Sequence, residues 1–206
     1  MVHILGITLK IHGTPPSKTC LAVCNHISWH DILVLGSIYK TTFLSKSEVG
    51  NWLIIGLLVK SAGTLFIHRG QGQFTLARRE IANTLKTGNN VLLFPEGTTT
   101  DGSKVKQFFY HLLEPAISNH IPIQPIAIHY SYQGSYATNP IAFIGQDTFV
   151  NHLWRTLNVK KITAHITFSH LIDTEQNPQA TAKKLHQTIS EMLHKSQAAA
   201  ASGRNV

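Results

Sequence analysis

The sequence predicts an α/β protein with a mixed, largely parallel sheet flanked by helices. Short apolar runs such as Leu21–Cys24 and Val91–Phe94 have the length of buried strands. Longer segments with helical periodicity separate these runs, and this alternation is typical of α/β folds. The 206-residue chain is 43% hydrophobic and 14% charged, which predicts a folded domain with a substantial core.

The first part of the chain alternates strands and helices. Ile4–Ile11 alternates apolar and polar residues and is predicted to be a strand, and Leu21–Cys24 is a short buried strand. After a polar turn, a helix is expected to run to about Tyr39, followed by a short strand over Thr42–Ser45. Glu48–Val59 is apolar on nearly every side, so we expect a helix that is either buried in the core or faces lipid.

The middle of the chain continues this alternation. Gly63–Arg69 is predicted to be a strand that ends in a cation, and Lys104–Asn119 a helix interrupted at Pro115. Between them, Val91–Phe94 is a strand that ends at a polar turn. Phe74–Lys86 is predicted to be an amphipathic helix with one apolar stripe, made of Phe74, Ala77, Ile81, Ala82 and Leu85.

The last part begins with a proline-rich segment. Pro122 and Pro125 argue against a regular central strand at that point, although Gln124–Tyr130 can resume as a strand. Ile141–Ile144 is a further short strand. Two more elements are predicted from their patterns, a helix over Phe149–Leu157 and a strand over Ile162–Ile172.

The final helix has a clear start signal. Asn177 is a favourable N-cap and Pro178 a favourable first helical residue. The helix carries an apolar stripe of Ala182, Leu185, Ile189 and Leu193. We expect residues 1–196 to form a single domain, with residues 197–206 as a flexible tail.

Charge and composition limit the possible partners. The net charge of +8 and the pI near 9.6 predict attraction to anionic head groups, phosphorylated substrates or nucleic acid. Since no nucleic-acid-binding signature is present, nucleic acid is the weaker choice. Cys20 and Cys24 are too few for a disulfide scaffold and fit a reducing compartment. No stretch reaches the roughly 18 apolar residues of a membrane span, so we expect any membrane contact to be peripheral.

The turn after the strand Leu21–Cys24 carries the strongest chemical signal. His26 can act as a base near neutral pH, and Asp31 could fix its tautomer if a helix begins at Ser28 between them. The same residues permit two other interpretations. Ser28 and Asp31 have the spacing of a helix capping box, and His26, His30 and Asp31 could contribute to a metal site. A metal site would need further ligands that nothing in the sequence fixes.

Four short motifs resemble, in order, those of the glycerolipid acyltransferases, the lysophosphatidic acid acyltransferase family. The resemblance covers about residues 5–172. The matching residues are Asn25, His26, Ser28 and Asp31 of N-H-x-S-x-x-D; Gly63, Phe66 and Arg69 of G-x-x-F-x-x-R; Phe94, Pro95, Glu96, Gly97 and Thr98 of F-P-E-G-T; and Pro122 of an apolar-P-x-x-P segment.

The resemblance implies a glycerol-3-phosphate acyltransferase-like fold and a direct acyl transfer. By likeness, His26 is the general base on the acceptor hydroxyl and Asp31 orients it, without an acyl-enzyme intermediate. Arg69, Glu96, Gly97 and Thr98 would hold the acceptor, to which we add Lys46 as a candidate phosphate contact, and the segment around Pro122 would border the acyl-donor side. By the same likeness, the segment around Pro122 carries no proton chemistry.

The partners implied are an acyl donor and a lysolipid. The donor would be acyl-CoA or acyl-carrier protein and the acceptor 1-acyl-sn-glycerol-3-phosphate, giving phosphatidic acid without a metal or organic cofactor. The enzyme would work peripherally at the cytoplasmic face of a membrane.

Three alternatives remain open from the sequence. Many family members have Arg-Ser where this chain has Thr99-Thr100, so one phosphate-binding cation is missing and the acceptor could be another lysolipid, such as a lyso-aminolipid. A non-catalytic module that binds anionic lipid would also explain the positive charge. A thioesterase that uses Ser28 is the least favoured, because the chain has no G-x-S-x-G motif.

Overall fold

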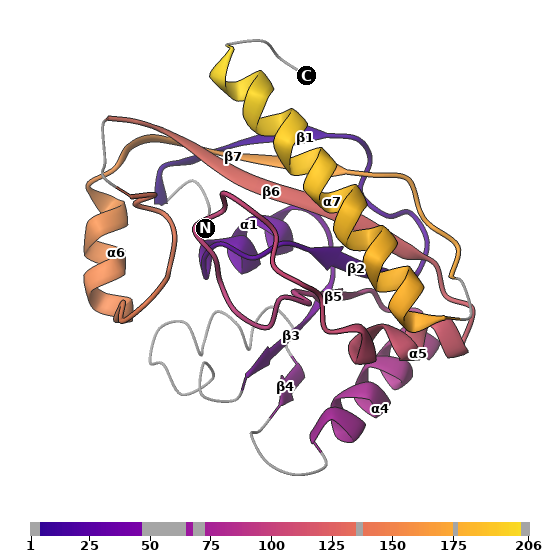
Figure 1. The fold of residues 1–206 in the computed structure, drawn as a ribbon. Coiled ribbons are helices and arrows are strands. Elements are labelled where there is room, and N and C mark those ends of the chain that lie inside the picture. The colour runs from indigo at the N-terminus through magenta and orange to yellow at the C-terminus, as the bar shows by residue number, and fades with distance from the viewer. Residues whose placement is uncertain (1–4, 47–64, 68–72, 135–137, 175–176, 203–206) are drawn as a thin grey trace.

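The computed structural model describes residues 5–46, 65–67, 73–134, 138–174 and 177–202 (Figure 1). Its strands are β1 (Ile7–His12), β2 (Leu21–Cys24), β3 (Thr42–Lys46), β4 (Leu65–Ile67), β5 (Val91–Leu93), β6 (Ile123–Gln133) and β7 (Lys160–Phe168). Its helices are α1 (His30–Ile38), α4 (Gln73–Lys86), the 3₁₀ turn η2 (Tyr110–Leu113), α5 (Glu114–Ser118), α6 (Phe149–Leu157) and α7 (Pro178–Ala201). The predicted helix Glu48–Val59 lies outside the described residues.

The described strands form one mixed sheet in the order β1-β7-β6-β2-β5-β3-β4. The neighbours from β6 to β4 pair in parallel, as do β1 and β7, while β6 and β7 pair antiparallel. The predicted fold class is therefore confirmed. Because β6, β2, β5, β3 and β4 run in one direction, their carboxyl ends meet at a single edge of the sheet, where open α/β proteins hold their ligands.

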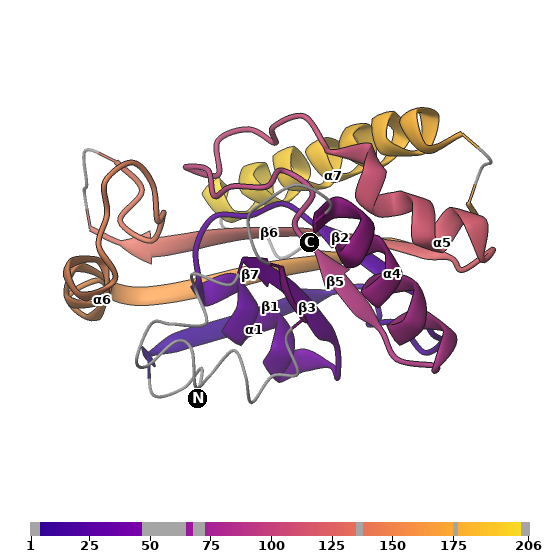
Figure 2. The same cartoon turned by 90° about the horizontal axis from the view of Figure 1, so that it is seen from below.

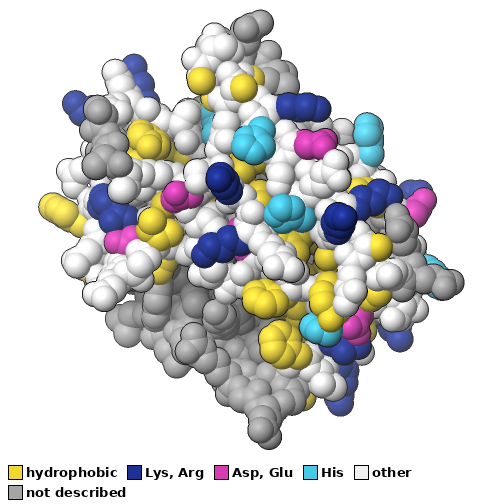
Figure 3. Space-filling view, in the orientation of Figure 1, with side chains coloured by type: hydrophobic (Ala, Val, Ile, Leu, Met, Phe, Trp, Pro, Cys, Tyr) yellow, Lys and Arg dark blue, Asp and Glu magenta, His cyan; other side chains and the backbone are white. Residues whose placement is uncertain are grey.

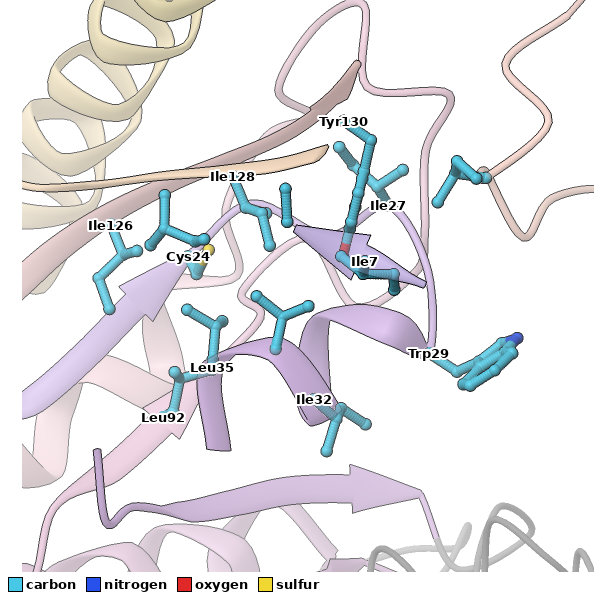
Figure 4. Close-up of a cluster of buried hydrophobic side chains, with 14 of the residues drawn as sticks. Ile7, Cys24, Ile27, Trp29, Ile32, Leu35, Leu92, Ile126, Ile128 and Tyr130 are labelled. Atoms are coloured by element: carbon cyan, nitrogen blue, oxygen red, sulfur yellow. The ribbon is translucent and has the colours of Figure 1, made fainter. Parts of the chain in front are cut away.

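The short strand β2 shows how the core is divided. Alternate strand residues point to opposite faces, so Ala22 and Cys24 join the cluster under α1, whereas Leu21 and Val23 join the cluster under α4, α5 and α7. All four side chains are fully buried. Figure 2 shows helices on both sides of the sheet, and Figure 4 shows Cys24, Leu35 and Ile126 meeting in the first cluster.

Helix α7 begins as the sequence predicts and ends later. The Asn177 side chain accepts hydrogen bonds from the backbone N–H groups of Gln179 and Ala180, and the predicted apolar stripe is buried. The helix continues to Ala201, into the segment expected to be a flexible tail. There the Gln197 side chain donates to the Gly102 carbonyl at 2.8 Å, which anchors the last turns to the rest of the fold.

Three local predictions were wrong. Helix does not form over residues 104–109, and Pro115 lies in the first turn of α5, where a missing N–H costs nothing. Ile141–Ile144 is irregular and does not form a strand. Its backbone instead bonds the turn that follows β2, where the Phe143 N–H donates to the Ile27 carbonyl at 3.0 Å. Phe74 is 64% exposed, whereas the buried stripe of α4 consists of Ala77, Ile81 and Leu85.

The prediction that two prolines exclude a regular central strand was also wrong. Pro125 lies inside β6, an interior strand, opposite Val23 of β2. Its carbonyl accepts from the Ser169 N–H, but the proline has no N–H to return the bond. The Gln124 side-chain amide donates to the Ser169 carbonyl in its place. A neighbouring side chain therefore replaces the missing backbone donor where the β6–β7 ladder ends.

No helix in the described part of the chain is long and apolar enough to cross a membrane. Cys20 and Cys24 are both buried free thiols.

Candidate active site

The candidate site begins where β2 ends. The Asn25 side chain continues the pairing of β2 with β6 after the backbone has turned away: its amide donates to the Ile128 carbonyl at 2.9 Å, and its oxygen accepts from the Ile128 N–H at 2.8 Å. Asn25 is 1% exposed. This two-bond clamp fixes the position at which His26 leaves the sheet.

His26 and Asp31 meet across the turn. Nδ1 of His26 lies 2.8 Å from Oδ2 of Asp31. The imidazole side chain is 16% exposed, whereas the carboxylate is fully buried. Because the carboxylate accepts a hydrogen bond, Nδ1 carries the ring proton and Nε2 carries a lone pair. Among the described residues, no group is hydrogen-bonded to Nε2. That nitrogen is placed to accept a proton from a bound molecule.

The structure shows both the backbone bonds of the capping interpretation and the side-chain contact that the acid–base interpretation requires. Oδ2 of Asp31 accepts hydrogen bonds from the backbone N–H groups of Ile27 and Ser28, at 2.7 and 3.0 Å, while it also holds His26. One carboxylate thus closes the turn and orients the imidazole. The predicted N-cap was wrong: α1 begins at His30 after Trp29, and the Ser28 hydroxyl contacts Nδ1 of His30 at 2.9 Å instead.

Tyr130 of β6 completes the environment of the carboxylate. Its hydroxyl donates to Oδ1 of Asp31 at 2.7 Å. Burial and the neighbouring Asp31 raise the pKa of Tyr130 well above its usual value, so the hydroxyl remains a donor. Figure 4 shows the side chain reaching from β6 toward the start of α1. Four donors therefore fix both oxygens of Asp31.

Glu96 links two loops at the same edge. Its Oε1 accepts from the His26 N–H and its Oε2 from the Lys106 N–H, both at 2.7 Å. The residue is 3% exposed, and burial raises the pKa of its carboxyl, against the opposing effect of the two backbone donors. Both oxygens are committed to the protein backbone, so Glu96 holds the peptide of His26 in place.

The loop after β5 forms one wall around His26. The Phe94 ring stacks on the imidazole with the ring centroids 3.9 Å apart. The Thr100 N–H and hydroxyl both donate to the His26 carbonyl, at 2.8 and 3.1 Å. Gly97, at φ +66°, and Thr98 are exposed on the same loop, and a Cβ on Gly97 would lie 2.9 Å from the Phe109 ring. Loop and turn thus behave as one rigid unit around the imidazole.

A second histidine in the turn has a different environment. His30 is 1% exposed, and burial together with His152 lowers its pKa to about 3, so the ring is neutral. It stacks on Trp29, whose indole N–H donates to Nδ1 of His152 at 3.0 Å. The Ser28 hydroxyl is buried against His30 rather than placed on His26. This arrangement gives Ser28 no access to a substrate and does not support the thioesterase alternative.

Comparison with known proteins agrees with this geometry. A family model described as "Acyltransferase" matches residues 8–129, more than half of the chain, and includes the turn and the loop just described. The chain belongs to the acyltransferase family. The chain is 40% identical over 162 residues to the lyso-ornithine lipid O-acyltransferase of Pseudomonas aeruginosa, covering 79% of this chain. It is 30% identical over 185 residues, 87% of this chain, to the 1-acyl-sn-glycerol-3-phosphate acyltransferase of Neisseria meningitidis serogroup B.

These alignments span only part of each relative. They cover 62% of the Pseudomonas protein and 71% of the Neisseria protein. Among solved structures, the 1-acyl-sn-glycerophosphate acyltransferase PlsC of Thermotoga maritima matches with a TM-score of 0.69 and 20% identity. That match covers 94% of this chain and 74% of the other, and it shows that the two share a fold.

The structure brings most of the predicted site residues to one edge of the sheet. These are Asn25, His26, Ser28, Asp31, Pro95, Glu96, Gly97 and Thr98. Pro122 is not among them: its carbonyl accepts from the Leu21 N–H at the start of β2, about 15 Å of strand away from His26. Lys46 and Phe66 lie on β3 and β4, whose side chains at these positions are not described, and Gly63 and Arg69 lie outside the described residues.

Sequence reasoning missed two residues of the candidate site. Tyr130 follows Ile126 and Ile128 on the buried face of β6, and a hydroxyl on such a face must find a polar partner. The alternation that places Tyr130 on the buried face of β6 was the signal available in the sequence, but it does not identify Asp31 as the partner of the hydroxyl. Thr100 was noted only as a departure from the family motif, yet it holds the carbonyl of His26.

Proposed function

We propose that this acyltransferase moves a fatty acyl group from a thioester to the free hydroxyl of a lysolipid. The observation that carries the proposal is the pair of His26 and Asp31, in which Nδ1 lies 2.8 Å from the buried carboxylate and the imidazole side chain is 16% exposed. The positions and order of the motifs, and the family to which the chain belongs, support the same reaction.

The proposed step needs one base and no covalent enzyme intermediate. Nε2 of His26 takes the hydroxyl proton as the lysolipid oxygen bonds to the thioester carbonyl carbon. The carbonyl oxygen becomes an oxyanion, and its collapse breaks the carbon–sulfur bond. The thiolate leaves and receives the proton from the imidazolium, so that an ester and a thiol result. Asp31 stabilises the imidazolium between the two proton transfers, and general-base assistance of this kind contributes about 100- to 10,000-fold.

We propose a lyso-aminolipid of the ornithine kind as the acceptor ahead of 1-acyl-sn-glycerol-3-phosphate. The relative from Pseudomonas is named for lyso-ornithine lipid, and Thr99 stands where many family members have an arginine. The Thr99 hydroxyl donates to the Phe143 carbonyl, so this position offers no cation to a phosphate. The phosphate-bearing acceptor is the second candidate, because the Neisseria relative is named for it.

The remaining partners follow from the same reaction. We propose acyl-CoA or acyl-carrier protein as donor, no metal or organic cofactor, and work at the cytoplasmic face of a membrane as a peripheral protein. Lys46, Arg69, Gly97 and Thr98 remain proposed acceptor contacts. For Glu96 we propose a positioning role instead, since both of its oxygens already bind backbone N–H groups.

The test is a thiol-release assay with product mass measured, over a panel of lyso-ornithine lipid, 1-acyl-sn-glycerol-3-phosphate and lysophosphatidylcholine, with both donors. We expect release only when an acceptor is present, fastest with lyso-ornithine lipid. The Ser28→Ala variant should still turn over. Thiol release without any acceptor would support a thioesterase, and no turnover with any pair would contradict the proposed function.

A further inference from the structure

Helix α6 is buried on one side and carries exposed apolar side chains on the other. Its inner side is buried, through His152 at 0% and Thr156 at 3% exposure. Its outer side carries Val150, Trp154 and Leu157, which are 72%, 72% and 53% exposed. A surface helix of a globular protein normally turns charged and polar residues outward. The outer side of α6 therefore requires an explanation that packing among the described residues does not give.

The exposed side chains form one stripe. Their spacing of four and then three residues places all three within about 60° around the helix axis. Yellow hydrophobic atoms protrude at the left edge of Figure 3, where Figure 1 places α6. We call these three residues the α6 stripe.

Positive charge lies next to the α6 stripe. Lys160 and Lys161 follow the end of α6 after two intervening residues, at the start of β7, and both are exposed. Arg155 on the helix is held by Asp147 at 2.8 Å and so adds no net charge there. A short helix with an aromatic apolar side and adjacent lysines, in a chain of net charge +8, has the composition of segments that lie in the interface of an anionic bilayer.

The helix that carries the α6 stripe contacts the turn that holds His26. The inner side of α6 contacts Trp29, which lies three residues after His26: its indole donates to His152 at 3.0 Å, and its rings meet Phe149 edge to face at 5.2 Å. Since α6 precedes β7, which runs antiparallel to β6, the helix lies at the edge of the sheet that carries the candidate site. A membrane held by α6 would therefore lie beside His26.

We propose that the α6 stripe inserts into the interface of an anionic phospholipid bilayer, with Lys160 and Lys161 on the lipid head groups. The inference deepens the proposed function, because it assigns the surface by which an enzyme of lysolipids would meet its acceptor. Trp154 suits this position, since an indole has an apolar body and a polar N–H. A second copy of the chain fits less well. Three side chains offer on the order of 300 Å², whereas a stable interface needs about 800 Å² from each partner.

The test measures binding without turnover. The protein is sedimented with vesicles of equal parts phosphatidylcholine and phosphatidylglycerol, and with vesicles of phosphatidylcholine alone. The variant Val150→Ser/Trp154→Ser/Leu157→Ser should bind the anionic vesicles about tenfold or more weakly than the wild type, because three apolar side chains no longer enter the interface. Lys160→Gln/Lys161→Gln should weaken binding to anionic vesicles only and reduce its dependence on salt.

Matched controls remove similar groups from the opposite edge of the sheet. Ile11→Ser/Leu171→Ser deletes two exposed apolar side chains, which are 44% and 36% exposed. Lys18→Gln/Lys183→Gln removes the same charge as the lysine variant, and both residues are exposed. Neither control should change vesicle binding. Brominated lipids should quench the wild type more strongly than Trp154→Phe.

The outcomes separate this inference from the proposed function. Acyl transfer to a short-chain, freely soluble lysolipid should be unchanged in the α6 variants, so a loss of vesicle binding with intact turnover supports the inference. Vesicle binding equal to that of the wild type would overturn it, whatever the turnover. A concentration-dependent dimer in size-exclusion chromatography that the α6 variant abolishes would instead assign the stripe to a second copy.

Discussion

The turn between β2 and α1 contains two histidines four residues apart, and these two residues differ in their partners and in their exposure. His26 has a carboxylate on one ring nitrogen and is partly exposed on the other side. His30 faces Ser28, Trp29 and His152 and is buried. We call the first set, with Asp31 and Tyr130, the catalytic half, and the second set the anchoring half. The residue type is the same in both, so partners and exposure decide what each histidine can do.

This comparison also explains why the turn is rigid without a long element behind it. The catalytic half is fixed by side chains from β6 and from the loop after β5, while the anchoring half reaches α6 through Trp29. One half supplies the chemistry and the other places it. Variants can test this division because each half has its own expected readout, which is turnover for the first and stability for the second.

The strongest challenge to the catalytic half is Asp31→Asn. An asparagine can place its oxygen at Oδ2 and keep the bonds from Ile27 and Ser28, so the turn should remain folded. It has no charge to stabilise the imidazolium, and we expect turnover to fall by about 100-fold or more. Steady-state assays with a thermal melt check this; turnover within tenfold of the wild type in a folded protein would contradict it.

Glu96→Gln tests whether Glu96 positions His26 or binds the acceptor. The glutamine NH₂ group would face either the His26 or the Lys106 N–H, leaving one buried donor without an acceptor. We expect a loss of about 1–3 kcal/mol in the free energy of unfolding. Turnover should fall about tenfold through kcat, with little change in the acceptor KM. A large rise in the acceptor KM with unchanged stability would return Glu96 to the acceptor site.

A smaller effect on turnover is expected for Tyr130→Phe. Without the phenol donor, Oδ1 of Asp31 loses its hydrogen bond from β6, and the carboxylate holds the imidazole less firmly. We expect kcat to fall about three- to tenfold, with KM unchanged. Tyr39→Phe, which removes the hydroxyl of a tyrosine at the other end of α1, should leave kcat unchanged. A Tyr130→Phe protein with the kcat of the wild type would show that the bond is only structural.

The anchoring half predicts a pH dependence of stability. Burial and His152 lower the pKa of His30 to about 3, whereas an unfolded histidine titrates near 6.5, and Asp31 opposes the shift only in part. As the pH falls below about 6.5 the unfolded chain gains a proton that folded His30 does not, so stability decreases. Between pH 7 and pH 5.5 this costs about 1 kcal/mol. Urea unfolding should show a smaller decrease for His30→Asn, and equal decreases would be evidence against a neutral, buried His30.

Much of the fold could be predicted because its signals are local. Asn177 and Pro178 mark the start of α7, and the apolar stripe ending at Leu193 marks its buried side. The spacing of His26 and Asp31 was sufficient to predict a contact if a turn and a helix met between them, and that contact is confirmed. The start of α1 was predicted wrongly, since the Ser28 hydroxyl contacts His30 and does not cap the helix.

What could not be predicted depends on residues distant in the sequence. Pro125 fits inside β6 only because Gln124 reaches Ser169. Glu96 was assigned to the acceptor by the family resemblance, and no sequence pattern reports the two backbone N–H groups that it binds. Tyr130 lies 99 residues from Asp31 and only the sheet brings them together. Exposure, which separates His26 from His30, is a property of the whole fold.

The most direct test of the division within the turn is to measure turnover per folded molecule and the melting temperature for His26→Ala and His30→Asn together. The account predicts that His26→Ala loses about 100- to 10,000-fold in turnover and keeps its melting temperature. His30→Asn should melt several degrees lower, yet turn over within about threefold of the wild type when folded. A His26→Ala protein that turns over at a near-normal rate, or a stable His30→Asn protein without activity, would contradict it.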